Sequence, residues 1–234
     1  MTYTVGYMIG SLSTVSINRI LARALVRLAP PEWSMVELPI KDLPLYNRDL
    51  DSDYPPEARA LKDAIANADS MLFVTPEYNR DIPGSLKNAI DWASRPWGQN
   101  SFARKPSAVI GTSPGKIGTA VAQQNLRSIL SFCNSPQMNA PEAYIQFTPG
   151  LINEDGEVTD QIVLGIGEFA GDLVERRAAV AGHPRDDGQE TGQTLGSRAV
   201  DPSLVGHPLG GPQRWYLARR DLPQIRLSQA RSGR

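Results

Sequence analysis

Residues 70–92 constrain the fold of this chain more than any other stretch. Residues 71–75 form a continuous apolar run without polar alternation, which is typical of a strand buried on both faces of a parallel sheet. Polar and aromatic residues follow at 76–80. Asp81 is then the expected N-cap of a helix that has Pro83 in its first turn and apolar residues at helical spacing beyond it. The stretch predicts strand, loop and helix, with the loop at the carboxyl end of a central strand, where open α/β sheets bind ligands.

Strands and helices are expected to alternate along the chain as far as about residue 180. Apolar runs predict strands at 3–9, 33–40, 71–75, 107–112 and 143–147, and apolar periodicity predicts helices at 17–28, 57–69, 83–93, 119–133 and 162–174. This alternation is consistent with a three-layer α/β sandwich whose five-stranded parallel sheet has the order 2-1-3-4-5. We expect one domain over residues 1–181 and a Gly/Pro/Arg-rich extension over 182–234, whose composition cannot build its own core.

Composition excludes several kinds of protein. The net charge is −1, so no global field attracts nucleic acid or a membrane surface. The N-terminus lacks the pattern of a signal peptide and no apolar run is long enough to span a membrane, so we expect a cytoplasmic protein. The only cysteine, Cys133, is expected to be a buried structural thiol, and both histidines, His183 and His207, follow the last strongly periodic segment. We therefore predict neither a metal site nor a catalytic side chain, and expect a bound cofactor to carry any chemistry.

Three loops, at 10–18, 76–80 and 112–118, have the composition of binding loops. Residues 10–18 are rich in hydroxyls and precede a helix, which suits one phosphate, although plain helix capping explains the same residues. The loop at 76–80 offers backbone groups, Tyr78 and Asn79 to the edge of a flat heterocycle, or it only caps the next helix. Residues 112–118 do not have Walker A spacing, and their glycines instead permit the backbone to approach the same ring from its other side.

The segment TPEYNRDIPGSLKNAIDW resembles the signature of the NAD(P)H-dependent FMN reductase family, flavodoxin-like flavoenzymes that include quinone, azo and chromate reductases. Residues 10–18 are similar to the family's GSxRxxSxN loop, which wraps the FMN phosphate. Ser13 stands where the family usually has arginine, which removes a charge-assisted partner of the phosphate. The resemblance implies a flavodoxin-like fold with FMN and NAD(P)H as cofactors. The predicted FMN contacts are Ser11, Ser13, Ser16, Ile17, Asn18, Pro76, Glu77, Tyr78, Asn79, Ser113, Pro114 and Gly115.

The resemblance also implies an activity and an assembly. We expect ping-pong transfer, in which the nicotinamide gives hydride to the flavin N5 and leaves before a quinone, azo dye, metal oxyanion or free flavin accepts the electrons. A homodimer or homotetramer is expected through the helix after the 76–80 loop. The residues that match the family there are Lys87, Asn88, Asp91 and Trp92. Two alternatives stay open at this point, a flavodoxin-type electron carrier and a flavodoxin-like interaction module without a cofactor.

Overall fold

The computed structural model describes residues 3–158, so the predicted helix at 162–174 and the extension at 182–234 lie outside the described residues. The elements are β1 (Tyr3–Ile9), α1 (Ile17–Leu28), β2 (Trp33–Glu37), the 3-10 helix η1 (Arg48–Leu50), α2 (Pro56–Asn67), β3 (Ser70–Val74), α3 (Gly84–Ser94), β4 (Ser107–Ser113), α4 (Ala120–Phe132) and β5 (Tyr144–Gln146). Strands and helices alternate as predicted, with boundaries that differ by a few residues.

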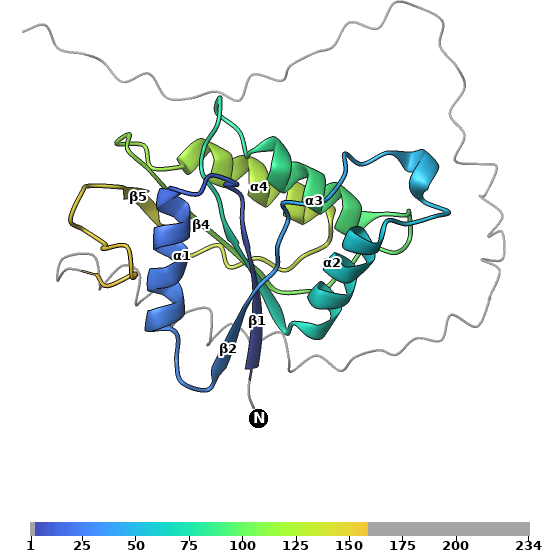
Figure 1. The fold of residues 1–234 in the computed structure, drawn as a ribbon, viewed down its shortest axis with the longest axis horizontal. Helices are drawn as coiled ribbons and strands as arrows, with labels where there is room; N and C mark the ends of the chain where they lie inside the picture. Colours follow the sequence, from blue (N-terminus) through green and yellow to red (C-terminus); the bar gives the residue numbers. More distant parts are fainter. Residues whose placement is uncertain (1–2, 159–234) are drawn as a thin grey trace, which may run out of the picture. The chain divides into compact units, whose positions relative to one another are not determined.

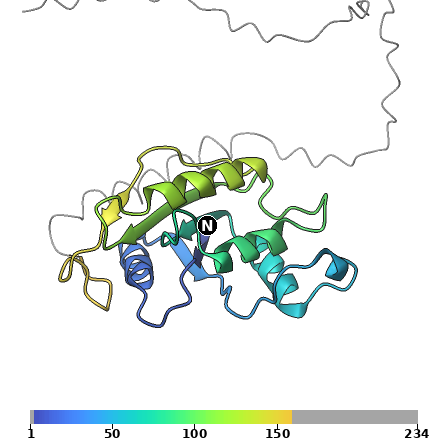
Figure 2. The ribbon, with the colours of Figure 1, turned by 90° about the horizontal axis from the view of Figure 1, so that it is seen from above.

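The five strands form one parallel sheet in the order β2-β1-β3-β4-β5, which confirms the predicted topology. Ile9 pairs with Val74, and Val74 pairs with Ile110. The carboxyl ends of β1, β3 and β4 therefore meet at one edge of the sheet (Figure 1), and β5 forms the outer edge beside β4 (Figure 2). The loops that follow β1, β3 and β4 start from this common edge.

Helices cover both faces of the sheet, which confirms the three layers. Alternate strand residues belong to two separate apolar clusters, because successive side chains of a strand point to opposite faces. One cluster packs α2, α3 and α4 on one face, and the other packs α1 on the opposite face (Figure 1). All five residues of β3 are buried, as its unbroken apolar run predicts. Among the described residues, no helix is long and apolar enough to cross a membrane.

The start of α3 differs from the prediction. Asp81 does not cap this helix, because its N-cap position is occupied by Pro83, which makes no side-chain capping bond. The Asp81 carboxylate instead accepts the N–H of Ile82 at 2.7 Å, and its backbone closes a tight turn with Tyr78. Asp81, which the sequence predicted as the helix N-cap, therefore belongs to this turn and not to α3.

Candidate functional site

The first loop, between β1 and α1, presents open donors at a helix N-terminus. Ser16 is the N-cap of α1, and its hydroxyl accepts the N–H of Arg19 at 3.3 Å. Within residues 3–158, the backbone N–H groups of Ser16, Ile17 and Asn18 donate to no acceptor, and the first turn of α1 holds no acidic residue. Ser11 is buried, while Ser13 is exposed and its hydroxyl accepts the N–H of Val15. Free N–H groups and the positive end of the helix dipole fit a phosphate.

The Asn18 side chain faces away from this open end. It is 1% exposed, and its amide donates to the carbonyl of Thr112 at 2.9 Å while accepting the N–H of Thr112 at 3.0 Å. Thr112 lies near the carboxyl end of β4, so the pair joins the loop after β1 to the loop after β4. Asn18 therefore fixes the spacing of two loops with its side chain and offers only its backbone N–H to a ligand.

The second loop, after β3, is closed by a tight turn. Tyr78 and Asp81 exchange backbone hydrogen bonds of 2.9 and 3.0 Å, and the two residues between them have left-handed backbones, with φ of 54° at Asn79 and 66° at Arg80. The turn occupies the backbone N–H and carbonyl of Tyr78, so within residues 76–81 the N–H groups of Glu77, Asn79 and Arg80 have no acceptor in the described residues. The Tyr78 side chain is 50% exposed and Pro76 is buried. The free donors and the exposed phenol suit the edge and face of a planar ring.

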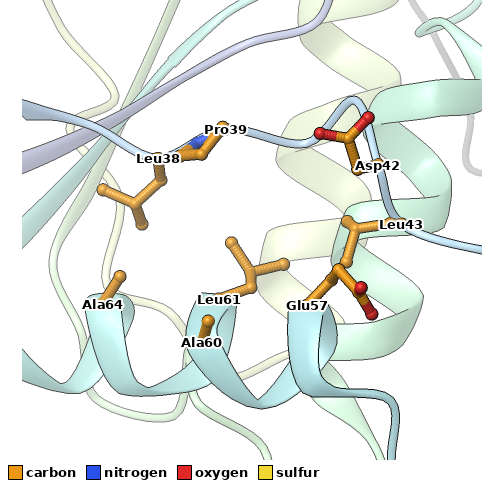
Figure 3. Close-up of a pocket in the computed structure, with 8 residues that line it drawn as sticks. All are labelled: Leu38, Pro39, Asp42, Leu43, Glu57, Ala60, Leu61 and Ala64. Carbon is orange, nitrogen blue, oxygen red and sulfur yellow. The ribbon is translucent and has the colours of Figure 1, made fainter.

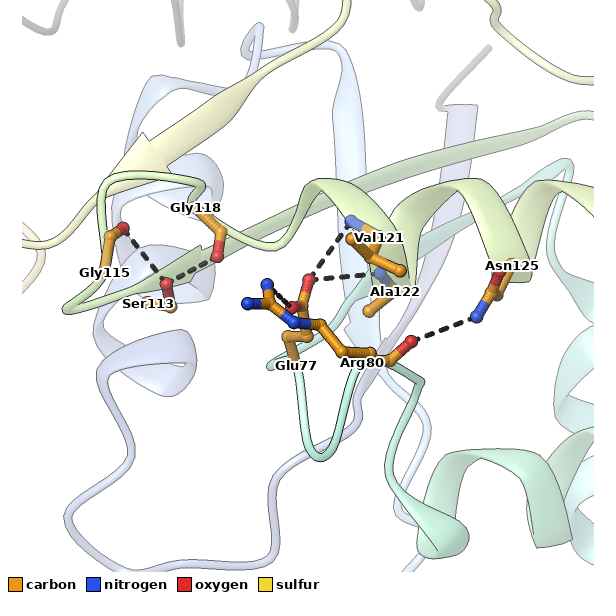
Figure 4. A network of polar contacts seen from close by, with 8 residues as sticks. All are labelled: Glu77, Arg80, Ser113, Gly115, Gly118, Val121, Ala122 and Asn125. Atoms are coloured by element: carbon orange, nitrogen blue, oxygen red, sulfur yellow. Dashed lines mark hydrogen bonds and ion pairs between the residues drawn. The ribbon is translucent and has the colours of Figure 1, made fainter.

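A network around Glu77 joins this second loop to α4 (Figure 4). One carboxylate oxygen accepts the N–H groups of Val121 and Ala122 at 3.1 and 3.2 Å, and the other accepts from the Arg80 guanidinium at 3.1 Å. The Asn125 amide donates to the carbonyl of Arg80 at 3.1 Å. Sequence reasoning missed Arg80 and Asn125, and nothing in the pattern of α4 indicates that Asn125 reaches back to a loop 45 residues earlier.

The third loop, after β4, is held in shape by hydrogen bonds from Ser113 within the loop. The Ser113 hydroxyl donates to the carbonyls of Gly115 and Gly118, and Gly118 has a left-handed φ of 63°. Pro114 and Gly115 are exposed at the tip. At the base of this loop a Cβ on Gly111 would lie 2.0 Å from the carbonyl oxygen of Thr75, so only glycine lets β4 approach the end of β3 this closely.

The long loop at 39–56 is anchored on α3. The carbonyl of Pro44 accepts from the Asn88 amide at 2.9 Å and from the Trp92 indole at 2.6 Å, and Trp92 is fully buried against Tyr46 and Tyr54. Asn88 and Trp92, two of the residues matched to the family's assembly helix, are thus used within the protomer. The exposed part of that match is the Lys87–Asp91 ion pair at 2.7 Å.

A hollow and the buried cysteine lie outside these loops. A hollow of about 230 Å³ between residues 38–43 and α2 has an apolar floor with Asp42 and Glu57 at one end (Figure 3), and none of the predicted FMN contacts lines it. Cys133 is 4% exposed, and burial raises the pKa of its thiol, as expected of a structural cysteine. Among residues 3–158, no group of three or more His, Cys, Asp or Glu side chains is placed to hold a metal ion.

The fold and these three loops define a class of protein. A parallel sheet of order 2-1-3-4-5 with a phosphate-suited helix N-terminus after β1, and ring-suited loops after β3 and β4, is the arrangement of flavodoxin-like proteins, whose ligands sit at this edge of the sheet. The donors present fit FMN: open N–H groups for its phosphate and further free N–H groups for its ring.

Comparisons with known proteins narrow this class to a family. A family model described as NADPH-dependent FMN reductase matches residues 3–150. The 2-hydroxy-1,4-benzoquinone reductase of a Burkholderia species is 49% identical over 161 residues, covering 69% of this chain and 88% of the relative. A quinone reductase of Pseudomonas putida is 46% identical over 160 residues, covering 68% and 86%. The solved structure of FerB from Paracoccus denitrificans, described as a flavoenzyme NAD(P)H:(acceptor) oxidoreductase, superimposes with a TM-score of 0.73 at 45% identity, covering 76% of this chain and 98% of FerB.

The chain belongs to the NADPH-dependent FMN reductase family. The predictions of an oxidoreductase, of FMN and NAD(P)H as its cofactors, and of a small-molecule electron acceptor are confirmed at this level. The match ends at residue 150 and therefore includes all three loops that carry the predicted FMN contacts.

Proposed function

We propose that the protein reduces a quinone with NAD(P)H, and that the three loops after β1, β3 and β4 hold FMN through the residues predicted from the sequence. The observation that carries the site is the start of α1, where the N–H groups of Ser16, Ile17 and Asn18 have no acceptor within residues 3–158. Three donors at the positive end of a helix, with the hydroxyls of Ser11, Ser13 and Ser16 nearby, suit the FMN phosphate.

The remaining contacts belong to the ring. The N–H groups of Glu77 and Asn79 would donate to the polar edge of the ring, and Tyr78 would lie along one of its faces. Pro76 of the same loop, and Ser113, Pro114 and Gly115 of the loop after β4, would complete the contacts. Bound FMN supplies hydride acceptance from the nicotinamide and electron donation to the second substrate. The protein binds and orients both partners and shields the ring from water. No side chain of these loops is required as an obligatory general acid or base.

A quinone acceptor is supported by the relatives named quinone reductases. The test compares kcat/KM for a simple benzoquinone with that for an azo dye, chromate and free FMN, under anaerobic conditions and at saturating NADPH. We expect the quinone to be preferred. In a second series, in which NADPH is varied at several fixed quinone concentrations, double-reciprocal plots should be parallel because the nicotinamide leaves before the acceptor binds. Intersecting lines would contradict the ping-pong order, and a preference for the azo dye or chromate would contradict the acceptor.

We also propose the remaining expectations from the sequence. The domain extends to about residue 181 with the extension beyond it, the protein works in the cytoplasm, and it assembles as a homodimer or homotetramer through the exposed side of α3 that carries Lys87 and Asp91. Sedimentation velocity of the full chain tests the assembly. A single monomeric boundary at micromolar protein would contradict it.

A further inference from the structure

The loop after β3 has a backbone conformation that requires support from outside the loop. Asn79 and Arg80 are consecutive non-glycine residues with positive φ, and a left-handed conformation costs roughly 1–2 kcal/mol at an ordinary residue. Asparagine tolerates this region because of its short polar side chain, whereas arginine does not. The two backbone hydrogen bonds between Tyr78 and Asp81 close the turn but do not set its direction relative to the rest of the sheet.

The Glu77 carboxylate supplies a support from α4. Its side chain is 10% exposed, and both of its oxygens are used. The oxygen that accepts from Val121 and Ala122 binds the first turn of α4, where free N–H groups and the helix dipole favour a negative charge. The second oxygen accepts from the guanidinium of Arg80, so the same carboxylate binds both Arg80, whose backbone is left-handed, and helix α4 (Figure 4).

Asn125 completes the attachment one turn further along α4. Its amide donates to the carbonyl of Arg80 at 3.1 Å and to the Asp81 carboxylate at 3.3 Å. Because α4 directly follows the loop after β4, the helix start is also the end of that loop. A group that binds the loop after β3 to the start of α4 therefore sets the distance between the two loops that flank the ring.

We propose that Glu77 is a positioning residue, whose carboxylate fixes the separation and tilt of the loops after β3 and β4 and so shapes the space for the isoalloxazine ring, while its own side chain does not contact the flavin. This inference rests on the proposed function, since the ring must sit between those loops. It assigns the effect of Glu77 to the ring end of FMN alone, because the phosphate end is formed by the loop after β1, which Asn18 attaches to Thr112 of strand β4 and not to α4.

The test compares FMN with riboflavin, which has the ring but no phosphate. Apo protein of the full chain is titrated with each flavin and binding is followed by quenching of flavin fluorescence. Loss of charge-assisted hydrogen bonds predicts that Glu77→Ala weakens both flavins by the same factor, about tenfold or more. Glu77→Gln keeps an oxygen for the two N–H groups of α4 but presents an NH2 group to the Arg80 guanidinium, so it should bind both flavins more tightly than Glu77→Ala and less tightly than wild type. The visible circular dichroism of bound flavin should change in Glu77→Ala and return in Glu77→Gln.

Two further variants separate positioning from general stability. Glu157→Ala removes an exposed ion pair with Arg27, in the last turn of α1, and a hydrogen bond from the Asn153 amide, and it should bind both flavins as wild type does. Asn125→Ala removes the second attachment and should weaken both flavins in the same ratio, which decides the question if Glu77→Ala does not fold.

Three results would overturn the inference. The first is binding of both flavins by Glu77→Ala within twofold of wild type with an unchanged dichroism spectrum, and the second is a loss confined to FMN. The third, available if Glu77→Ala does not fold, is wild-type binding of both flavins by Asn125→Ala. A wild-type chain that binds neither flavin would instead contradict the proposed function itself, and the inference with it.

Discussion

The hydrogen-bonded pair between Asn18 and Thr112 gives a prediction with a calculable size. Asn18→Ala leaves both the N–H and the carbonyl of Thr112 buried without a partner. A buried polar group that loses its partner costs about 1–3 kcal/mol, so the two groups together should lower the free energy of unfolding by about 2–6 kcal/mol. Urea denaturation of the apo protein, followed by circular dichroism, measures this difference by linear extrapolation.

Asn18→Asp tests the same reasoning with a side chain of the same shape. An ionised aspartate still accepts the Thr112 N–H but cannot donate to the Thr112 carbonyl, and burial raises the pKa of the new carboxyl above its unfolded value of about 3.9. A raised folded pKa means that stability is present at low pH and lost as the pH rises through that pKa. The deficit against wild type should therefore be larger at pH 7 than at pH 4.

The matched control for both variants is Asn67→Ala, an exposed asparagine at the end of α2, which should change the free energy of unfolding by no more than about 0.5 kcal/mol. If Asn18→Ala is as stable as this control, or if the Asn18→Asp deficit does not depend on pH, the argument that this pair joins the two loops is wrong.

Three further predictions follow from single contacts. Gly111→Ala should destabilise the fold by about 3 kcal/mol, because its Cβ meets the backbone oxygen of Thr75 and backbone cannot move aside as a side chain does; a thermal melt like that of wild type would contradict this. Ser16→Ala should lower the free energy of unfolding by about 1 kcal/mol through loss of the α1 N-cap and weaken FMN but not riboflavin, and equal weakening of both flavins would exclude Ser16 from the phosphate site. The Tyr54 hydroxyl donates to the backbone carbonyls of Trp92 and Arg95, and burial raises its pKa, so its contribution to the free energy of unfolding is present below pH 10 and lost at higher pH. Tyr54→Phe should therefore cost about 1–2 kcal/mol at pH 7 and less above pH 10, and a deficit that stays constant with pH would contradict the assignment.

Much of the fold follows from local pattern. The unbroken apolar run of residues 71–75 indicated a strand covered on both faces, and residues 70–74 form the fully buried central strand β3. The alternation of strands and helices then restricted the sheet to a few possible strand orders. The error at Asp81 has a physical cause, since the residue is equally suited to cap a helix or to close a turn, and the choice depends on the exchange of backbone bonds with Tyr78.

The candidate site was predictable to the level of loops but not of side-chain roles. Hydroxyls before an amphipathic helix placed Ser16 at a helix start, and the structure makes it the N-cap. The partners of Asn18 and Glu77 were not predictable, because Thr112 lies 94 residues away and Val121 44 residues away along the chain. Such pairs become visible only when the strands place their loops side by side.

The central claim is that this chain binds FMN and reduces it with NAD(P)H. The most direct measurement is a visible spectrum of the purified full chain, supplemented with FMN if colourless, before and after anaerobic addition of NADPH and then NADH. We predict a two-band yellow spectrum that bleaches with at least one nucleotide. A bound flavin that stays oxidised with both nucleotides, or a protein that binds no flavin, would contradict it.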